Sequence, residues 1–301
     1  MPELPDVELY LSALRPRVLG EVLQRVELFN PFVLRSVDPP LRAVEGATVH
    51  QLSRLGKRIV FGLEGDLYLI VHLMIAGRFR WHPDRKAPPK RLSLAAMHFS
   101  SGLLVLTEAG TKRRAALYVV KGREGLAAHD PGGLEVLDLD LAGFRSRLLS
   151  ESHTLKRALT DPTIFSGIGN AYSDEILHGA RLSPLKLTGQ LGEPEIERLY
   201  RAVRDTLVGW RDRLLRETAG AFPAKVTAFR EGMAVHGRFG QPCPVCATAV
   251  QRIAYAQNEV NYCPTCQTGG KLLADRALSR LLKSDWPKTL EELEERRRGS
   301  N

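Results

Sequence analysis

The sequence Cys243-Pro244-Val245-Cys246 is followed, 16 residues later, by Cys263-Pro264-Thr265-Cys266. Each Cys-x-x-Cys knuckle can turn two thiolates toward one ion, and two such knuckles complete a tetrahedral zinc site. All four ligands would be thiolates and no water-activating Glu stands beside them, so the spacing predicts one structural Zn²⁺ per chain. Zinc binding would fold this short segment, which is too small to form a core of its own. Four unrelated buried cysteines or a redox pair are the alternatives.

The chain as a whole is basic. Of its 301 residues, 43 are Lys or Arg and 34 are Asp or Glu, which gives a formal net charge of +9. The length suits two domains with an appendage, and 44% hydrophobic residues are enough to form buried cores. The charge favours an anionic partner, of which nucleic acid is the most common.

No targeting or membrane segment is predicted. The start of the chain is acidic, and the longest apolar stretch, residues 67–76, is interrupted by His72 and is too short to span a bilayer. The four cysteines do not form the pattern of a secreted disulfide framework. We therefore expect a protein of a bacterial-type cytosol or nucleoid, with no membrane partner.

Hydrophobic periodicity predicts strands in the first part of the chain and helices in the second. A helix should begin near Pro5, and turn-rich residues 130–133 should form a linker. The sequence predicts strands at 58–63, 67–74 and 103–107, helices at 140–149, 155–159 and 194–215 with Asp140 and Thr154 as caps, short strands within 233–267, and a charged, helix-prone tail.

The amino terminus is a candidate nucleophile. Pro2 beside Met1 is small enough that the initiator methionine would normally be removed. The new terminus would be a secondary amine with a pKa near ~8, below the ~10 of lysine. Such an amine can attack an aldehyde-like carbon and form an iminium, and Glu3 could shuttle protons. The plainer interpretation is that Pro2 and Glu3 only lead into a helix.

Five motifs follow one another through residues 2–267. They read Pro2-Glu3-Leu4-Pro5-Asp6-Val7-Glu8, Leu55-Gly56-Lys57-Arg58, His72-Leu73-Met74-Ile75-Ala76-Gly77-Arg78, Gly167-Ile168-Gly169-Asn170-Ala171-Tyr172-Ser173-Asp174-Glu175-Ile176-Leu177 and Val235-His236-Gly237-Arg238. In this order and spacing the chain resembles the formamidopyrimidine-DNA glycosylase and endonuclease VIII family, although the family has Glu in place of Asp6.

The resemblance implies an α+β multidomain fold. It predicts an N-terminal catalytic β-sandwich domain with an N-terminal helix (1–133) and a helix–two-turn–helix DNA-binding domain (134–232). A four-cysteine zinc finger (233–267) and a charged helical tail (268–301) follow. The resemblance also implies a monomeric base-excision repair glycosylase with abasic-site lyase activity, which removes oxidised or ring-opened bases from damaged DNA.

The expected catalytic residues are Pro2, Glu3 and Lys57. By the resemblance, Pro2 is the nucleophile at C1′ of the damaged nucleotide, which must leave the base stack. Glu3 acts as acid and base during base loss and strand cleavage, and Lys57 contacts a backbone phosphate near the lesion.

The expected DNA contacts begin with Asn170, which would hold a flanking phosphate where Gly167 and Gly169 allow a close backbone approach. Lys156 would add a phosphate contact, or it could lie on a solvated helix face. Met74 would fill the gap left by the flipped nucleotide as an apolar wedge. Alternatively, Met74 is a gap-filling core residue on a β-strand.

Two departures from the family pattern concern DNA contacts. The family carries Arg five residues before the third cysteine, whereas this chain has Asn258 beside Glu259. The neutral amide neutralises no phosphate, which should cost on the order of 1.5–3 kcal/mol. The family loop Asp-x-Arg-Arg-Phe-Gly corresponds best to 111–116, where Arg113 can reach the orphaned base but Ala115 replaces the Phe wedge.

A third departure concerns the substrate. Residues 219–223 do not match the loop that covers the flipped base in guanine-lesion enzymes, so no preferred lesion is predicted. In the tail, Leu278, Leu281 and Leu282 could pack on the protein surface with Trp286. The alternative functions are a catalytically weak or inactive paralogue that binds damaged, single-stranded or branched DNA, and a zinc-ribbon protein of transcription or translation.

Overall fold

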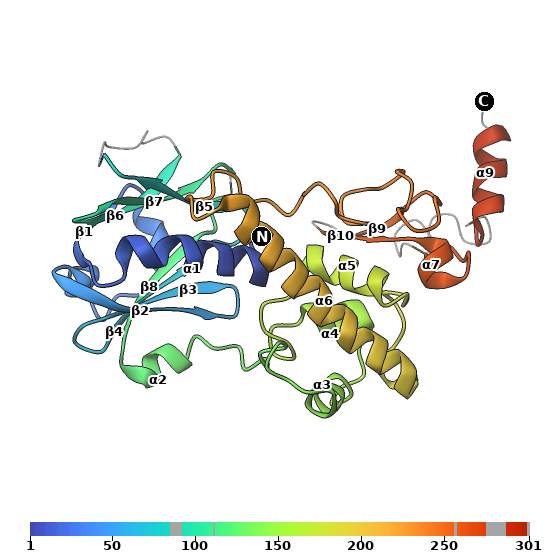
Figure 1. Ribbon diagram of the computed structural model, residues 1–301, viewed down its shortest axis with the longest axis horizontal. Coiled ribbons are helices and arrows are strands. Elements are labelled where there is room, and N and C mark those ends of the chain that lie inside the picture. Colours follow the sequence, from blue (N-terminus) through green and yellow to red (C-terminus); the bar gives the residue numbers. More distant parts are fainter. Residues whose placement is uncertain (85–91, 111, 256–257, 275–286, 300–301) are drawn as a thin grey trace. The chain divides into compact units, whose positions relative to one another are not determined.

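The computed structural model describes residues 1–84, 92–110, 112–255, 258–274 and 287–299 (Figure 1). The chain forms two compact units, each described here by itself. Unit 1 contains Met1–Gly133 and Val208–Ala228, and unit 2 contains Leu134–Leu207 together with Phe229 and the residues after it.

Unit 1 is built on one continuous antiparallel sheet in the order β5-β7-β6-β1-β2-β3-β4-β8. The strands are β1 (Val22–Leu28), β2 (Ala47–Leu55), β3 (Arg58–Leu63), β4 (Leu67–His72), β5 (Gly77–His82), β6 (Ser93–Phe99), β7 (Gly102–Glu108) and β8 (Ala116–Lys121). Only Val22↔Thr48 and Leu23↔Ala47 join β1 to β2, so the sheet consists of two four-stranded halves.

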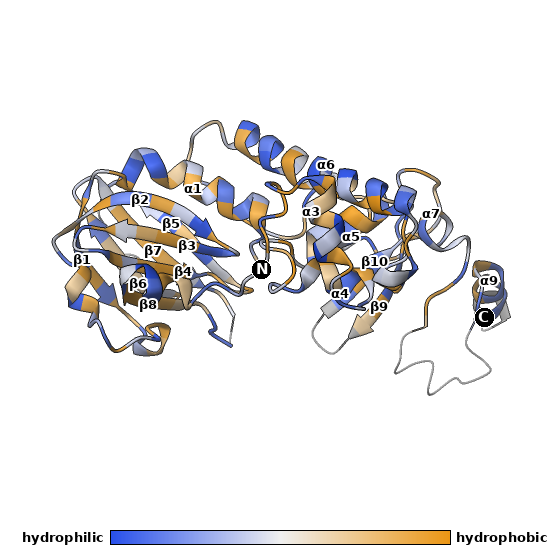
Figure 2. Cartoon of the chain, turned by 90° about the horizontal axis from the view of Figure 1, so that it is seen from below, coloured by the Kyte–Doolittle hydropathy of each residue, from blue (hydrophilic) through white to orange (hydrophobic). Residues whose placement is uncertain are grey.

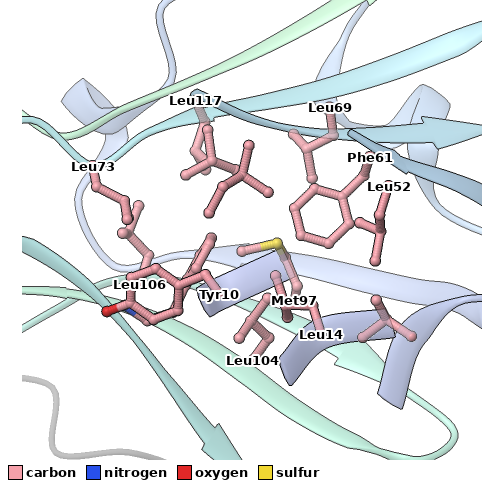
Figure 3. Close-up of a cluster of buried hydrophobic side chains, with 14 of the residues drawn as sticks. Tyr10, Leu14, Leu52, Phe61, Leu69, Leu73, Met97, Leu104, Leu106 and Leu117 are labelled. Atoms are coloured by element: carbon pink, nitrogen blue, oxygen red, sulfur yellow. The ribbon is translucent and has the colours of Figure 1, made fainter. Parts of the chain in front are cut away.

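The core of unit 1 lies between these halves. Figure 3 shows side chains of both halves directed into one cluster, with Leu69 and Leu117 from one half and Leu104 and Met97 from the other. Tyr10, from helix α1, reaches the same cluster. The two halves pack as a sandwich to whose core α1 contributes, and the predicted fold class is confirmed.

Helix α1 spans Leu4–Val18 and begins beside Pro5, as predicted. Asp6, at the third helical position, accepts a hydrogen bond from the backbone N–H of Glu3 at 2.9 Å. A carboxylate there satisfies a donor that the helix cannot satisfy itself. Asp6 therefore completes the N-terminal capping of α1, even though its side chain is shorter than that of the Glu in the family motif.

Unit 2 begins with three short helices, of which the first two have side-chain caps. They are α3 (Leu141–Leu148), α4 (Leu155–Thr160) and α5 (Asn170–Gly179), and α2 (Gly122–Ala127) precedes them in unit 1. The carboxylate of Asp140 accepts from the N–H of Gly143 at 2.7 Å, and the hydroxyl of Thr154 accepts from the N–H of Arg157 at 3.4 Å. Both predicted caps are confirmed.

The long helix α6 spans Glu193–Thr218 and belongs to both units. Hydrophobic and hydrophilic residues alternate around it (Figure 2). Leu199 and Val203 are buried in its first part, whereas Leu214 belongs to the core of unit 1. The structure thus differs from the predicted domain 134–232, because residues 208–228 pack with unit 1.

The zinc-finger region contains the hairpin of β9 (Gln251–Tyr255) and β10 (Asn258–Tyr262), followed by α7 (Pro264–Thr268). In the tail, α9 spans Leu290–Gly299, which agrees with the predicted helical character. The tail residues expected to pack on the surface, Leu278, Leu281, Leu282 and Trp286, lie outside the described residues. None of the described helices is long and apolar enough to cross a bilayer.

Candidate functional site

The amino terminus lies in a buried, charged environment. Pro2 is buried and Glu3 is only 2% exposed. Burial lowers the pKa of the Met1 amino group, and the nearby cations Arg78 and Lys57 act in the same direction, against the carboxylates of Glu3 and Asp6. A terminal amine here is therefore unprotonated more often than an amine in water, as a nucleophile requires.

Lys57 occupies the two-residue turn between β2 and β3, where Leu55 pairs with Arg58. Gly56 supplies the left-handed conformation of this turn, with φ +60. Arg54 fixes the turn to helix α1, since its guanidinium bonds the carbonyl of Gly56 at 2.9 Å and the carboxylate of Glu8 at 3.1 Å. Arg54 thereby holds Lys57 near the start of α1.

Met74 lies in a turn after β4, not on a strand. Its φ is +52, a conformation rarely adopted by residues with a side chain, and its side chain is half-buried. Its backbone N–H donates to Nδ1 of His72 at 3.0 Å. Gly77 closes the turn, because a Cβ on Gly77 would lie 2.2 Å from the carbonyl oxygen of Leu73. The interpretation of Met74 as a core residue on a β-strand is therefore wrong, and the predicted strand 67–74 ends at His72.

Arg113 is exposed on the loop between β7 and β8. The buried carboxylate of Glu108 accepts the backbone N–H groups of Arg114 at 2.9 Å and Ala115 at 3.0 Å, which anchors the end of this loop. Ala115 is only 3% exposed and belongs to the core. Thr111, at the start of the predicted motif, lies outside the described residues.

Residues 219–223, which departed from the family loop, are part of unit 1. The ring of Phe222 packs against those of Tyr10, with centroids 6.0 Å apart, and Trp81, at 6.4 Å. Arg17 lies over the same ring and its guanidinium bonds the carbonyl of Gly220. This segment is therefore anchored on unit 1 by its aromatic residue.

Asn170 begins helix α5, after Gly167 with φ +83 and the extended Gly169. Its side-chain amide donates to the backbone carbonyl of Glu259 at 2.9 Å, so it joins the helix start to strand β10. A helix N-terminus offers backbone N–H groups and a partial positive charge to an anion.

Lys156 is buried rather than solvated. Its ammonium lies 2.5 Å from Asp174 and 2.7 Å from the backbone carbonyl of Asn170. Asp174 also accepts from Nδ1 of His236 at 2.8 Å and from the N–H of Asn261 at 3.2 Å. The interpretation of Lys156 as a solvated helix face is therefore wrong, because the side chain belongs to a buried network that joins α4, α5 and β10.

Two neighbours of this network were not predicted as functional from the sequence. Glu175 accepts the backbone N–H groups of Ala234 at 2.6 Å, and of Val235 and His236 at 2.9 Å each, while burial raises its pKa. His178 places Nε2 3.3 Å from Sγ of Cys243. Glu175 and His178 are three residues apart and therefore lie on one face of α5, but the sequence does not show which residues they contact.

Asn258 begins strand β10, opposite Tyr255; the structure describes its backbone but not its side chain. The negative charge of Glu259 is balanced by Arg252 on β9, at 3.5 Å. Arg252 also lies 4.4 Å from the ring centroid of Phe239. A cation is thus present on the hairpin, although not at the position predicted from the family.

The four cysteines meet in one cluster, with all ligand atoms within 4.8 Å of one another. The Sγ atoms of Cys243 and Cys266 are 3.9 Å apart, and Cys246 lies 3.4 Å from Cys263 and 3.5 Å from Cys266. A tetrahedral ion with Zn–S bonds of about 2.3 Å requires sulfur separations of about 3.8 Å. The cluster therefore fits a structural zinc ion, and the alternative of unrelated cysteines is wrong.

Comparisons with known proteins cover most of the chain. Family models match residues 1–115 as the formamidopyrimidine-DNA glycosylase N-terminal domain and 133–209 as the formamidopyrimidine-DNA glycosylase H2TH domain. A third model, a zinc finger found in FPG and IleRS, matches residues 240–269.

Two curated relatives match different shares of this chain. The formamidopyrimidine-DNA glycosylase of Thermus thermophilus is 34% identical over 286 residues, which cover 90% of this chain and 100% of the relative. An uncharacterized formamidopyrimidine-DNA glycosylase-like protein of Mycobacterium tuberculosis is 42% identical over 153 residues, covering 51% of this chain and 93% of that protein.

Solved structures give the same match. A complex of Lactococcus lactis Fpg with abasic-site DNA has a TM-score of 0.76 and 26% identity, and covers 88% of this chain and 99% of that one. MutM (Fpg) from Thermus thermophilus has a TM-score of 0.71 and 32% identity, covering 88% of this chain and 98% of that one.

Proposed function

Because the chain belongs to the formamidopyrimidine-DNA glycosylase family, we propose that it is a base-excision repair DNA glycosylase that works through Pro2. Loss of Met1 would make the Pro2 nitrogen the terminal amine. This amine would attack C1′ of the damaged nucleotide, release the base and leave an iminium, from which the strand is cleaved. The observation that carries this proposal is the burial of Pro2 and Glu3 at the N-terminus. At the same end of the chain, burial and the nearby cations Arg78 and Lys57 lower the pKa of the Met1 amino group.

Each proposed role follows from a described environment. Glu3 is buried beside the amine and would exchange protons during base loss and strand cleavage. Lys57, on its fixed turn, would contact a phosphate near the lesion. Asn170 begins a helix whose N-terminus suits a flanking phosphate.

We propose that three further residues contact DNA. The exposed Arg113 would contact the orphaned base, and Met74, on its left-handed turn, would enter the gap in the stack. Asn258, at the start of β10, would offer a neutral hydrogen bond to the backbone. We propose that the protein acts as a monomer in the cytosol or nucleoid.

Borohydride trapping on abasic-site DNA tests the proposal, because only an amine bound to the sugar leaves a reduced covalent adduct. The purified chain is compared with Pro2→Gly and Glu3→Gln, and mass spectrometry establishes whether Met1 is removed. We expect an adduct at the N-terminal peptide of the processed protein and none when Met1 is retained. A processed protein that binds the DNA without any adduct would overturn the proposed chemistry.

That outcome would favour the second candidate function, a paralogue that recognises damaged DNA without turnover. The observations behind this candidate are Asn258 at the expected arginine position and the burial of Ala115 at the expected wedge position. The burial of Pro2 and Glu3 at the N-terminus supports catalysis, since DNA binding alone does not require a buried carboxylate beside the chain end.

A further inference from the structure

Phe32 is a large, exposed aromatic side chain on a segment whose backbone is held by hydrogen bonds. It lies on the short helix η1 (Pro31–Val33), and its side chain is 77% exposed. The carboxamide of Asn30 accepts the backbone N–H of Phe32 at 3.0 Å, which fixes the start of the turn. Phe32 also lines one small surface pocket together with Arg113 and Ala115.

The segment that carries Phe32 is attached to the beginning of β8. Leu34 forms a parallel bridge with Leu117, and the N–H of Arg35 donates to the carbonyl of Leu117 at 2.8 Å. The hydroxyl of Ser36 accepts the N–H of Val119 at 2.7 Å. Phe32 is therefore held in a defined place beside the loop that precedes β8.

Exposed cations lie on the two segments that meet at this ring. Arg113 lines the same small pocket as Phe32, and Lys112 and Arg114 flank Arg113 in the chain. Arg35 is exposed on the segment of Phe32 itself, which also carries the exposed Asp38. An aromatic face among basic side chains is the arrangement with which proteins stack on bases while their cations hold phosphates. A purely hydrophobic partner would not require Arg113 beside the ring.

We propose that Phe32 stacks on a base of the DNA strand opposite the lesion, beside the orphaned base contacted by Arg113. The inference rests on the proposed function, since it requires damaged DNA as the ligand. Ala115 cannot stack, because its side chain is buried in the core and its N–H is held by Glu108. Phe32 would supply from another segment the aromatic surface that Ala115 lacks.

The test measures the affinity for an abasic-site duplex that carries 2-aminopurine in the opposite strand, next to the orphaned base. Phe32→Ala should bind on the order of 5- to 100-fold more weakly than wild type, because stacking on one aromatic side chain accounts for that range. It should also lose the change in 2-aminopurine fluorescence that wild type produces. Val37→Ala is the matched control, since Val37 is 90% exposed nearby and should bind like wild type.

Phe32→Trp gives an independent readout, because a tryptophan stacked on a base loses fluorescence. We expect additional quenching by this duplex in Phe32→Trp, relative to wild type with its own tryptophans, and retained affinity. If wild type binds and forms the borohydride adduct while Phe32→Ala binds equally well, or if Phe32→Trp shows no added quenching, only this inference fails. If wild type does not bind the duplex at all, the proposed function fails with it.

Discussion

Removing the carboxylate of Asp174 should destabilise unit 2, even though Asp174→Asn changes only one atom of the side chain. Asp174 is 1% exposed and accepts bonds from Lys156 at 2.5 Å, His236 at 2.8 Å and the N–H of Asn261 at 3.2 Å. In the variant, the ammonium of Lys156 stays buried without its counterion. Its other partner, the carbonyl of Asn170 at 2.7 Å, is neutral.

The expected loss is about 3–5 kcal/mol in the free energy of unfolding, the usual cost of removing one partner from a buried ion pair. Lys156→Met should cost a similar amount, because it leaves the Asp174 carboxylate buried with only neutral N–H donors and His236. The double variant Lys156→Met/Asp174→Asn should be more stable than the sum of the two losses predicts, since it buries no unpaired charge.

Urea denaturation of the zinc-loaded chain, followed by circular dichroism, measures these free energies of unfolding. Salt titrations of DNA binding, with the same variants, test whether Lys156 contacts a phosphate. Arg201→Ala, which removes an exposed ion pair with Glu197, should change stability by no more than about 1 kcal/mol. The reasoning is refuted if both single variants are as stable as wild type and their effects add. If Lys156→Met leaves stability intact but weakens DNA binding and lowers its salt dependence, Lys156 contacts a phosphate instead.

Three further predictions concern zinc, pH and the hairpin. His178→Phe removes the contact with Cys243 and should weaken zinc binding about 10- to 100-fold in chelator competition; an unchanged affinity would contradict this. Burial lowers the pKa of His72 from 6.5 to about 4, so the folded state binds fewer protons than the unfolded state between these values. Stability should therefore fall by up to about 3 kcal/mol as pH drops from 6.5 to 4, and His72→Gln should lack this loss in acid denaturation. Asn258→Arg should tighten DNA binding on the order of 10- to 100-fold and steepen its salt dependence by about one phosphate contact; equal affinity and slope would show that the position faces no phosphate.

The sequence predicted those features whose cause is local. The zinc cluster follows from cysteine spacing alone, and the cap at Asp140 follows from the residues around one helix start. The contact of Lys156 with Asp174 could not be predicted from the sequence. Asp174 lies 18 residues away, and only the packing of two helices brings the two side chains together. The turn at Met74 was missed because its hydrophobic neighbours continue the strand pattern, while the close approach of Gly77 to the carbonyl of Leu73 bends the chain.

The departures from the family pattern do not by themselves indicate a loss of catalysis. At two of them, a residue of another segment offers a related group. Arg252, on β9, pairs with Glu259, the acidic neighbour of Asn258. Phe32 presents an aromatic ring beside Arg113, where Ala115 is buried. Exposed groups of this kind suit DNA binding, which a glycosylase and a DNA-binding paralogue share. The departures therefore concern how DNA would be held, whereas catalysis depends on the amine at the N-terminus, which borohydride trapping tests directly.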